Sequence, residues 1–292
     1  MTSQGINVGN NSGDQTVQPG KSKTYTYYAH PDYGQTGSVI WDFGNLTGNV
    51  RDGLYGGLII GPRGSVYRDP ATGKDISLGN SWKADVIIDK SYPENRNREN
   101  YRDFALYFQD EDNILGTSFM PYLQNVAGLT GVNYRLEPWS YREDEGCELG
   151  NMFTACVAAA SDPATPTLKA HAGDRVMINI FGAHNEQNQM FNVDGHQWRR
   201  HLNQENSDMI DVEEFGGGEY IQAFIKAGGT YNNPGTYLWL NARTPYQQAG
   251  QWGYFKVLPA GDRSVLPLGG ASPTGVKSAS KDAGDDVLSM NR

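Results

Sequence analysis

The sequence has few of the features on which many enzyme and membrane classes depend. It contains only two cysteines in 292 residues, and neither belongs to a C-x-x-C pair or a C-x-x-C-H motif, which excludes zinc ribbons and c-type haem. No apolar run approaches the roughly 20 residues of a membrane-spanning helix. The G-x-S-x-G, Walker and H-E-x-x-H signatures are absent. The sequence therefore assigns no catalytic residue by motif and predicts no membrane span.

Charge and composition narrow the classes of partner and of fold. There are 24 basic and 33 acidic residues, so the formal net charge is −9. Such a chain repels phosphate backbones, and we expect no nucleic-acid partner. An aromatic content of 11% supports a packed core and argues against general disorder. The acidic runs at 110–112 and 143–145 could hold paired carboxylates, but such runs are more typical of solvated loops.

Short strand patterns recur along the chain, each bounded by Gly, Pro, Asn or Asp. Residues 23–28, KTYTYY, alternate polar side chains with Tyr, as a half-buried strand does. No stretch keeps a helical period between proper caps, so we predict an all-β sandwich or barrel. The predicted strands are residues 23–28, 57–60, 84–88, 104–108, 176–181, 220–225, 235–240 and 252–258.

Two blocks with the same order of patterns suggest a duplicated domain, and the first block is short. Residues 1–62 hold only three or four strand patterns, whereas a complete sandwich needs about seven or eight strands. Residues 63–102 are polar, and the chain beyond Pro259 has few large apolar residues. We predict a partial domain at 1–62, a linker at 63–102, a complete domain at 103–259 and a mobile tail at 260–292.

Five motifs give the chain a resemblance to the multicopper oxidases. They are RDGLYGGLII (51–60), GVNYRLEPW (131–139), HAGDRVMINI (171–180), FNVDGHQW (191–198) and PGTYLWLNARTPYQQAGQWGYFKV (234–257). The resemblance runs from about Gly5 to Leu258. It implies cupredoxin-like Greek-key β-sandwich domains, one partial and one complete. It also implies a first domain truncated on its N-terminal side, because the family's first His-x-His would lie upstream of Gly5.

Multicopper oxidases use copper to take electrons from a substrate and reduce oxygen. Imidazole nitrogens and a thiolate hold the metal, and blue-copper centres use two His, one Cys and a weak axial ligand. The resemblance places these ligands at positions where this chain has other side chains. They are Trp41 and Phe43; Gln189, Asn192 and Asp194; Leu240, Asn241 and Ala242; Tyr246; and, for the axial ligand, a position near Trp252. We therefore expect no copper cofactor and no catalytic residue.

Two smaller groups of residues remain. His184, His196 and His201 could form a small metal site, but their spacing matches no standard motif, and surface or hydrogen-bonded histidines are the commoner case. Cys147 and Cys156 are predicted to form a disulfide in an oxidising compartment, the alternative being two separate small hydrophobic side chains. By loop closure such a bridge stabilises a fold by roughly 2–3 kcal/mol.

The function that follows is that of a binding or structural protein on an oxidase scaffold. We expect it to be a subunit of an extracellular or periplasmic assembly, in contact with a protein partner or with further copies of itself. The alternative is a copper-dependent oxidoreductase subunit whose metal site is completed by missing N-terminal sequence or by a partner chain.

Overall fold

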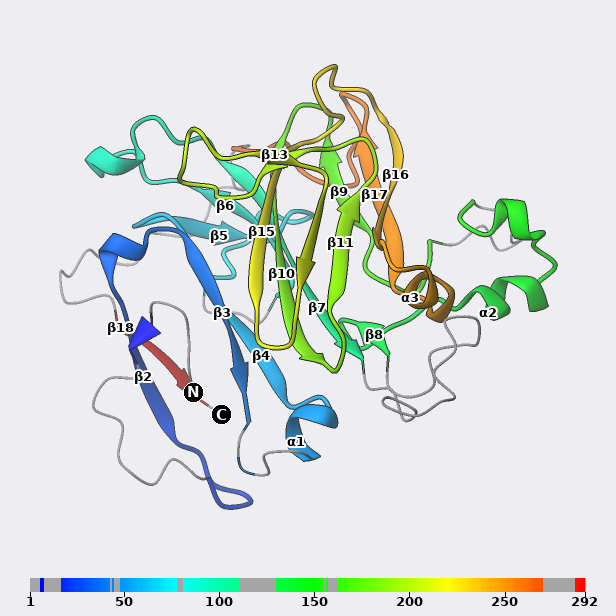
Figure 1. Ribbon diagram of the computed structural model, residues 1–292. Coiled ribbons are helices and arrows are strands. Elements are labelled where there is room, and N and C mark those ends of the chain that lie inside the picture. Colours follow the sequence, from blue (N-terminus) through cyan, green and yellow to red (C-terminus); the bar gives the residue numbers. More distant parts are fainter. Residues whose placement is uncertain are drawn as a thin grey trace.

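The computed structural model describes residues 6–7, 17–42, 44, 48–77, 81–110, 130–154, 156, 162–269 and 287–291. Strands dominate, as predicted, and the larger part of the chain is a cupredoxin-like Greek-key β-sandwich (Figure 1). The eight predicted strands are all present. Among the described residues, no helix is long and apolar enough to cross a membrane.

The first sheet of the sandwich has the strand order β15-β10-β7-β6-β5, with β8 paired to β7. Strands β7 and β10 run parallel, and the other neighbours are antiparallel. The segment 63–102, predicted to be a linker, contributes β5 and β6 to this sheet. The strands are β5 (Val66–Arg68), β6 (Lys83–Ile87), β7 (Tyr101–Asp110), β8 (Gly131–Val132), β10 (Arg175–Asn185) and β15 (Tyr220–Lys226).

The second sheet has the order β14-β11-β16-β17-β9, in which β17 and β9 are parallel. The chain passes from β9 in this sheet to β10 in the first and back to β11, which is the crossing pattern of a Greek key. The strands are β9 (Leu168–His171), β11 (Gln189–Val193), β14 (Val212–Phe215), β16 (Gly235–Asn241) and β17 (Trp252–Leu258). Strands β12 (Trp198–Arg199) and β13 (Met209–Ile210) form a separate pair.

Alternate residues of the two sheets fill the core between them, because successive side chains of a strand point to opposite faces. On β7 these are Phe104, Leu106 and Phe108, and from the second sheet Trp239 and Phe255 pack against them. All five are at most 2% exposed. On the other face of β7 and β10, Ala105 and Phe181 pack against the N-terminal part of the chain.

The N-terminal part consists of β1 (Ile6–Asn7), β2 (Thr24–Ala29), β3 (Thr36–Trp41), α1 (Gly48–Arg51) and β4 (Tyr55–Ile60), with the 3-10 turn η1 (Pro31–Tyr33). Strands β3 and β4 form an antiparallel pair that lies on the outer face of the first sheet, where Val39 packs with Ala105 and Phe181. The opposite side of this β3–β4 pair is covered by β2, through contacts of Tyr27 with Leu58.

Two parts of the predicted tail lie against the rest of the chain. Residues 287–291, which form β18 (Val287–Asn291), pair antiparallel with β2. Nearer the sandwich, Val265 is 7% exposed, and the amide of Leu266 donates to the carbonyl of Pro70.

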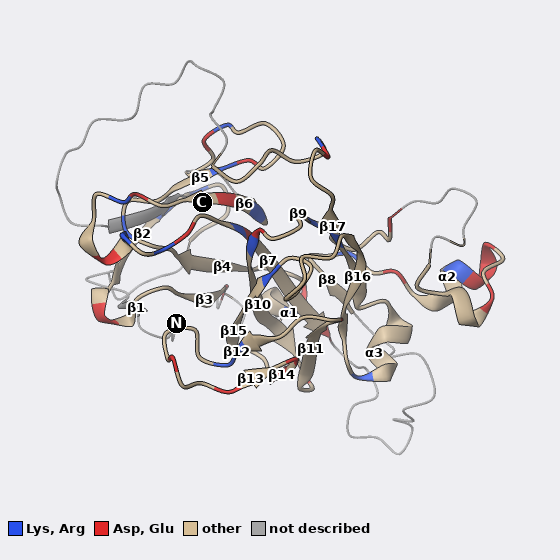
Figure 2. Ribbon diagram, turned by 90° about the horizontal axis from the view of Figure 1, so that it is seen from above, with Lys and Arg blue, Asp and Glu red and all other residues tan. Residues whose placement is uncertain are grey.

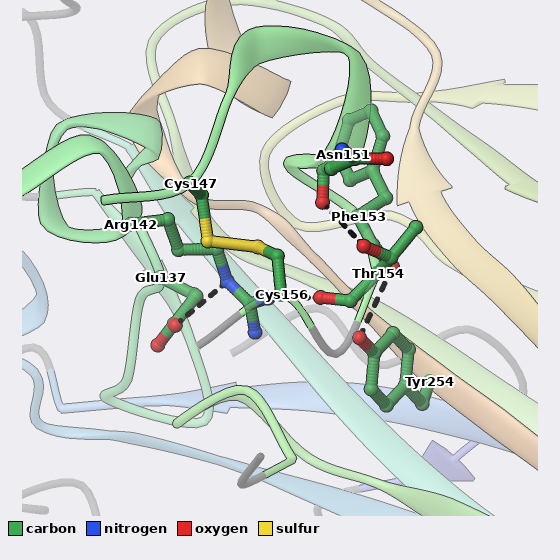
Figure 3. Close-up of a disulfide and its surroundings, with 8 residues drawn as sticks. All are labelled: Glu137, Arg142, Cys147, Asn151, Phe153, Thr154, Cys156 and Tyr254. Atoms are coloured by element: carbon green, nitrogen blue, oxygen red, sulfur yellow. Dashed lines mark hydrogen bonds and ion pairs between the residues drawn. A yellow bond between two sulfur atoms is a disulfide. The ribbon is translucent and has the colours of Figure 1, made fainter. Parts of the chain in front are cut away.

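A short helical lobe projects from the second sheet. It contains α2 (Trp139–Asp144) and the 3-10 turn η3 (Leu149–Asn151) and ends at the disulfide between Cys147 and Cys156, whose Cα atoms are 5.6 Å apart (Figure 3). The buried Arg142 holds the lobe to β17, because its guanidinium lies 4.8 Å from the ring centre of Trp252. The remaining helical elements are η2 (Pro93–Asn95) and α3 (Thr244–Ala249).

Candidate functional site

Three of the positions at which the resemblance places copper ligands come together at one end of the sandwich. Gln189 begins β11, Asn241 ends β16, and Tyr246 lies on α3. A fourth residue, Gln251, joins them from the position just before β17. All four side chains are at most 1% exposed. We call these four residues the polar cluster.

Asn241 is at the centre of the polar cluster, and its hydrogen bonds use all of its amide group. Its Nδ2 donates to Oε1 of Gln189 and, at 2.7 Å, to Oε1 of Gln251. Its Oδ1 accepts from the backbone amides of Met190 at 3.2 Å and Arg243 at 3.1 Å. Two donors and two acceptor positions are the whole capacity of a carboxamide. Asn241 therefore has no free lone pair for a further ligand.

The two glutamines are also held by their amide nitrogens. Nε2 of Gln251 donates to the carbonyl of Gln109 at 3.0 Å, and Nε2 of Gln189 donates to the carbonyl of Gln187 at 3.0 Å. Each glutamine thus has both its oxygen and its nitrogen in hydrogen bonds. Buried polar groups that are paired in this way make a core rigid and specific, whereas unpaired ones are costly.

The phenol of Tyr246 extends the network to a buried carboxyl group. Its hydroxyl donates to Oδ2 of Asp110 at 2.6 Å, and the amide of Glu186 donates to Oδ1 at 3.0 Å. Burial raises the pKa of Asp110 to about 6, although these hydrogen bonds act in the opposite direction. Burial, together with the Asp110 carboxylate, also raises the pKa of Tyr246, so that the phenol stays protonated.

The polar cluster does not fit copper. A blue-copper centre needs a thiolate and two imidazoles, which bind the metal far better than neutral carboxamides do. The cluster supplies three carboxamides and a protonated phenol, and their polar atoms already bind one another. Both cysteines of the chain are joined to each other in the lobe. The chemistry that these residues can perform at this place is structural hydrogen bonding.

The other predicted ligand positions lie outside the polar cluster. Asn192 and Leu240 are cross-strand neighbours on β11 and β16, half-buried on the face opposite to Asn241, and Nδ2 of Asn192 donates to the carbonyl of Asp211. Leu240 and Ala242 carry no donor atoms. Asp194 is exposed.

Trp41 comes from the β3–β4 pair and is not a member of the polar cluster. It ends β3, and its indole Nε1 donates to the carbonyl of Ala183 at 2.5 Å. A Cβ atom at Gly218 would be only 2.6 Å from the Trp41 ring, so the ring packs directly on the backbone there. The neighbouring position, Phe43, is outside the described residues.

The three histidines do not form a metal site. His196 is 3% exposed, its Nε2 accepts from the amide of Gly228 at 3.0 Å, and its Nδ1 therefore carries the proton and donates to the carbonyl of Asp194 at 2.8 Å. Burial lowers the pKa of His196, which keeps this tautomer neutral. His184 is half-buried and His201 exposed. In the part of the chain that the structure describes, no three His, Cys, Asp or Glu side chains gather as a metal-binding group.

Near Trp252, where the resemblance places the weak axial ligand, the side chain that reaches the polar cluster is that of Gln251. The Trp252 side chain is on the other side of β17, where its indole donates to the carbonyl of Glu137 at 2.9 Å and its ring lies under Arg142. The sequence offers one signal that Gln251 belongs with the other members of the polar cluster. Asn241, Tyr246 and Gln251 follow one another at intervals of five residues.

A second buried polar group contains charges and lies at the start of β7, the end opposite to Asp110. Arg102 is fully buried, its Nη1 is 2.8 Å from Asp85 Oδ1, and its Nε is 2.7 Å from Asp174 Oδ2. Its Nη2 lies 3.3 Å from Nδ1 of His171 and donates to the carbonyl of Leu266. Arg102 thus joins β6, the turn between β9 and β10, and the segment after β17.

The comparisons with known proteins return only structural similarity. No protein-family model and no curated protein matches the chain. A structure described as a multicopper oxidase is 14% identical with a TM-score of 0.41 and aligns over 80% of this chain and 56% of that one. For the blue copper oxidase from Nitrosomonas europaea the values are 14%, 0.40, 81% and 55%, and for multicopper oxidase mgLAC 16%, 0.40, 82% and 56%. The chain spans little more than half the length of these proteins.

Proposed function

We propose that this chain is a non-catalytic structural or binding subunit built on a multicopper-oxidase-like scaffold. The observation that carries the proposal is the hydrogen-bonding of the polar cluster. Gln189, Asn241 and Gln251 bind one another and the backbone, and Tyr246 binds Asp110. A copper ion could enter only by breaking these bonds, and the side chains exposed in this way would be poor copper ligands.

The lobe supports a role in binding another protein. It is held in one position by the disulfide and by Arg142, which pairs with Glu137 and donates to the carbonyl of Thr154 (Figure 3). It presents Tyr141 and Leu149, which are 59% and 64% exposed. Exposed aromatic and apolar side chains on a rigid element are suited to protein contacts, because little conformational entropy is lost on binding.

The charge of the lobe indicates the chemistry of its partner. Glu143, Asp144 and Glu145 are all exposed at the end of α2. Figure 2 shows acidic residues in red on the projecting part of the molecule around α2. A basic surface on the partner, or on another copy of the chain, would be complementary to them. The disulfide is consistent with an extracellular or periplasmic location, since such bonds persist in oxidising compartments.

Oxygen uptake tests the non-catalytic part of the proposal. The purified chain, incubated with Cu(II) and dialysed, is expected to consume no oxygen above the buffer control when a phenol or ferrous iron is supplied as electron donor. A multicopper oxidase treated in the same way is the positive control. Copper-dependent oxygen consumption by this chain, abolished by a copper chelator, would favour the alternative of a copper oxidoreductase.

A further inference from the structure

The contact between the β3–β4 pair and the first sheet contains a buried carboxyl group. Asp103 lies on β7, two residues before Ala105, and so faces the same side of the sheet, which the β3–β4 pair covers. It is 5% exposed. It accepts a hydrogen bond of 2.5 Å from Nδ2 of Asn179 on β10, and among the described residues it takes part in no ion pair.

Asn179 connects the carboxyl group to the β3–β4 pair. Its Oδ1 accepts from the hydroxyl of Tyr220 at 2.5 Å. The ring of Tyr220 lies directly on β3, because a Cβ atom at Gly37 would be 2.6 Å from it. The Tyr220 ring therefore links Asp103 and Asn179 to the backbone of β3.

Two further tyrosines beside Asp103 also contact the N-terminal part of the chain. The hydroxyl of Tyr101, on β7, accepts from Nε2 of Gln35 at 2.9 Å, and Gln35 immediately precedes β3. The hydroxyl of Tyr67, on β5, packs against Gly61, which immediately follows β4, because a Cβ atom at Gly61 would be 2.2 Å from it. Gln35 and Gly61 lie side by side, because Thr36 pairs with Ile60, so the end of the β3–β4 pair where β3 begins and β4 ends contacts side chains that surround one carboxyl group.

Among the residues that the structure describes, no positively charged side chain pairs with Asp103. The titrating groups that face it are Tyr67, Tyr101, Tyr107 and Tyr220, and burial raises the pKa of each, so that all four stay neutral. Arg98 contacts Oε1 of Gln35 at 3.3 Å. Arg102, which precedes Asp103 on β7, points to the other side of the strand, where Asp85 and Asp174 bind it.

We propose that Asp103 is a proton-operated latch: the β3–β4 pair is held tightly on the first sheet when this carboxyl is protonated, and loosened when it ionises. A carboxylate without a counterion in an apolar interface is costly, and the cost is relieved if water reaches it. Water can reach it when the β3–β4 pair moves away from Tyr220 and Tyr101.

The pH range follows from the environment of the group. Burial raises the pKa of Asp103 to about 7, although the hydrogen bond from Asn179 acts to lower it. In an open or unfolded state the value returns to about 3.9. A carboxyl whose pKa is raised on docking contributes its full stabilisation below pH ~4, and this is lost as the pH rises through ~7. The contact is therefore expected to be tight in acid and weaker above neutral pH.

Hydrogen exchange of the amides in Thr36–Trp41 and Tyr55–Ile60 tests the latch. After correction for intrinsic exchange rates, their protection is expected to fall by at least roughly tenfold between pH 5 and pH 8. In Asp103→Asn, which imitates the protonated group, protection should stay high and independent of pH. Asp110→Asn is the matched control, because it removes another buried carboxyl of raised pKa, the one that binds Tyr246, and should leave the fall in place.

Two results would overturn the latch. One is a wild-type protein in which the protection of the β3–β4 pair does not change between these pH values, and the other is an unchanged pH dependence in Asp103→Asn. If Asp103→Asn does not fold, Asp103→Ser also lacks the titrating group and takes its place in the same comparison. If the wild-type protein shows no change in protection between these pH values, that result alone rejects the proposal, without either variant.

Discussion

Arg102→Met is expected to lower the free energy of unfolding by about 3–5 kcal/mol at pH 7.5. The substitution keeps most of the apolar length of the side chain and removes its charge. Asp85, which is 5% exposed, and Asp174 then lose the guanidinium that binds both of them. Removing one partner of a buried ion pair is costly because the charge that remains has neither solvent nor counterion. Urea-induced unfolding followed by Trp fluorescence measures the difference.

The pH dependence of this stability loss distinguishes the effect of the missing Arg102 charge from the effect of changed packing. Burial raises the pKa of Asp85 to about 6 in the intact protein, although Arg102 acts to lower it. Without Arg102 the Asp85 carboxyl is protonated more easily, so the deficit of Arg102→Met should shrink as the pH falls from 7.5 to 5. Arg175→Met is the matched control, since Arg175 pairs with Glu99 at the surface, where the two side chains are 44% and 71% exposed. It should change stability by no more than about 0.5 kcal/mol. Equal losses in the two variants would contradict this account of Arg102.

The triple variant Gln189→His, Asn241→Cys and Tyr246→His is expected to bind one copper ion and turn blue. The three side chains already meet in the polar cluster, and the substitutions supply two imidazoles and one thiolate. Gln251 remains beside position 241, where a glutamine oxygen can serve as the weak axial ligand. An absorption band at roughly 600 nm, from charge transfer between thiolate and copper, is the expected signal.

The same variant with Asn241→Ser in place of Asn241→Cys is the matched control. It keeps both imidazoles and lacks the thiolate, so it should bind copper weakly and show no such band. Without metal, both variants should be less stable than the wild type, because each broken hydrogen bond of the polar cluster costs about 1–3 kcal/mol when its partner stays buried. A folded triple variant that takes up no copper would mean that these positions do not converge as the polar cluster indicates.

The strands that the sequence predicts are those whose pattern is simple. KTYTYY and WGYFKVL became β2 and β17, because alternating or continuous apolar residues lie between turn-forming glycines. Strands β3 and β11 are among those that the sequence patterns do not predict. In β3 the sequence TGSVIW contains Gly37, which is required because the Tyr220 ring occupies the place of a side chain. In β11 the fully buried Gln189 interrupts an apolar pattern that Phe191 and Val193 continue.

The candidate site was only partly visible in the sequence. The resemblance identified Gln189, Asn241 and Tyr246 by their spacing in motifs, but a glutamine such as Gln251 has no pattern of its own. Asp110 belongs to an acidic run that is typical of a solvated loop, yet it is fully buried, because Tyr246 and the amide of Glu186 bind its carboxyl group. The latch residue Asp103 was not predicted either. The groups around it come from β5, β10 and β15, which only the folded sheet brings together.

Copper binding by the wild-type chain tests the central claim most directly. The claim is that the polar cluster satisfies its own hydrogen bonds and has no place for copper. The purified, disulfide-bonded protein, incubated with Cu(II) and dialysed, is expected to retain no stoichiometric copper by elemental analysis and to remain colourless. One tightly held copper ion per chain, with a strong absorption band at roughly 600 nm, would contradict the claim.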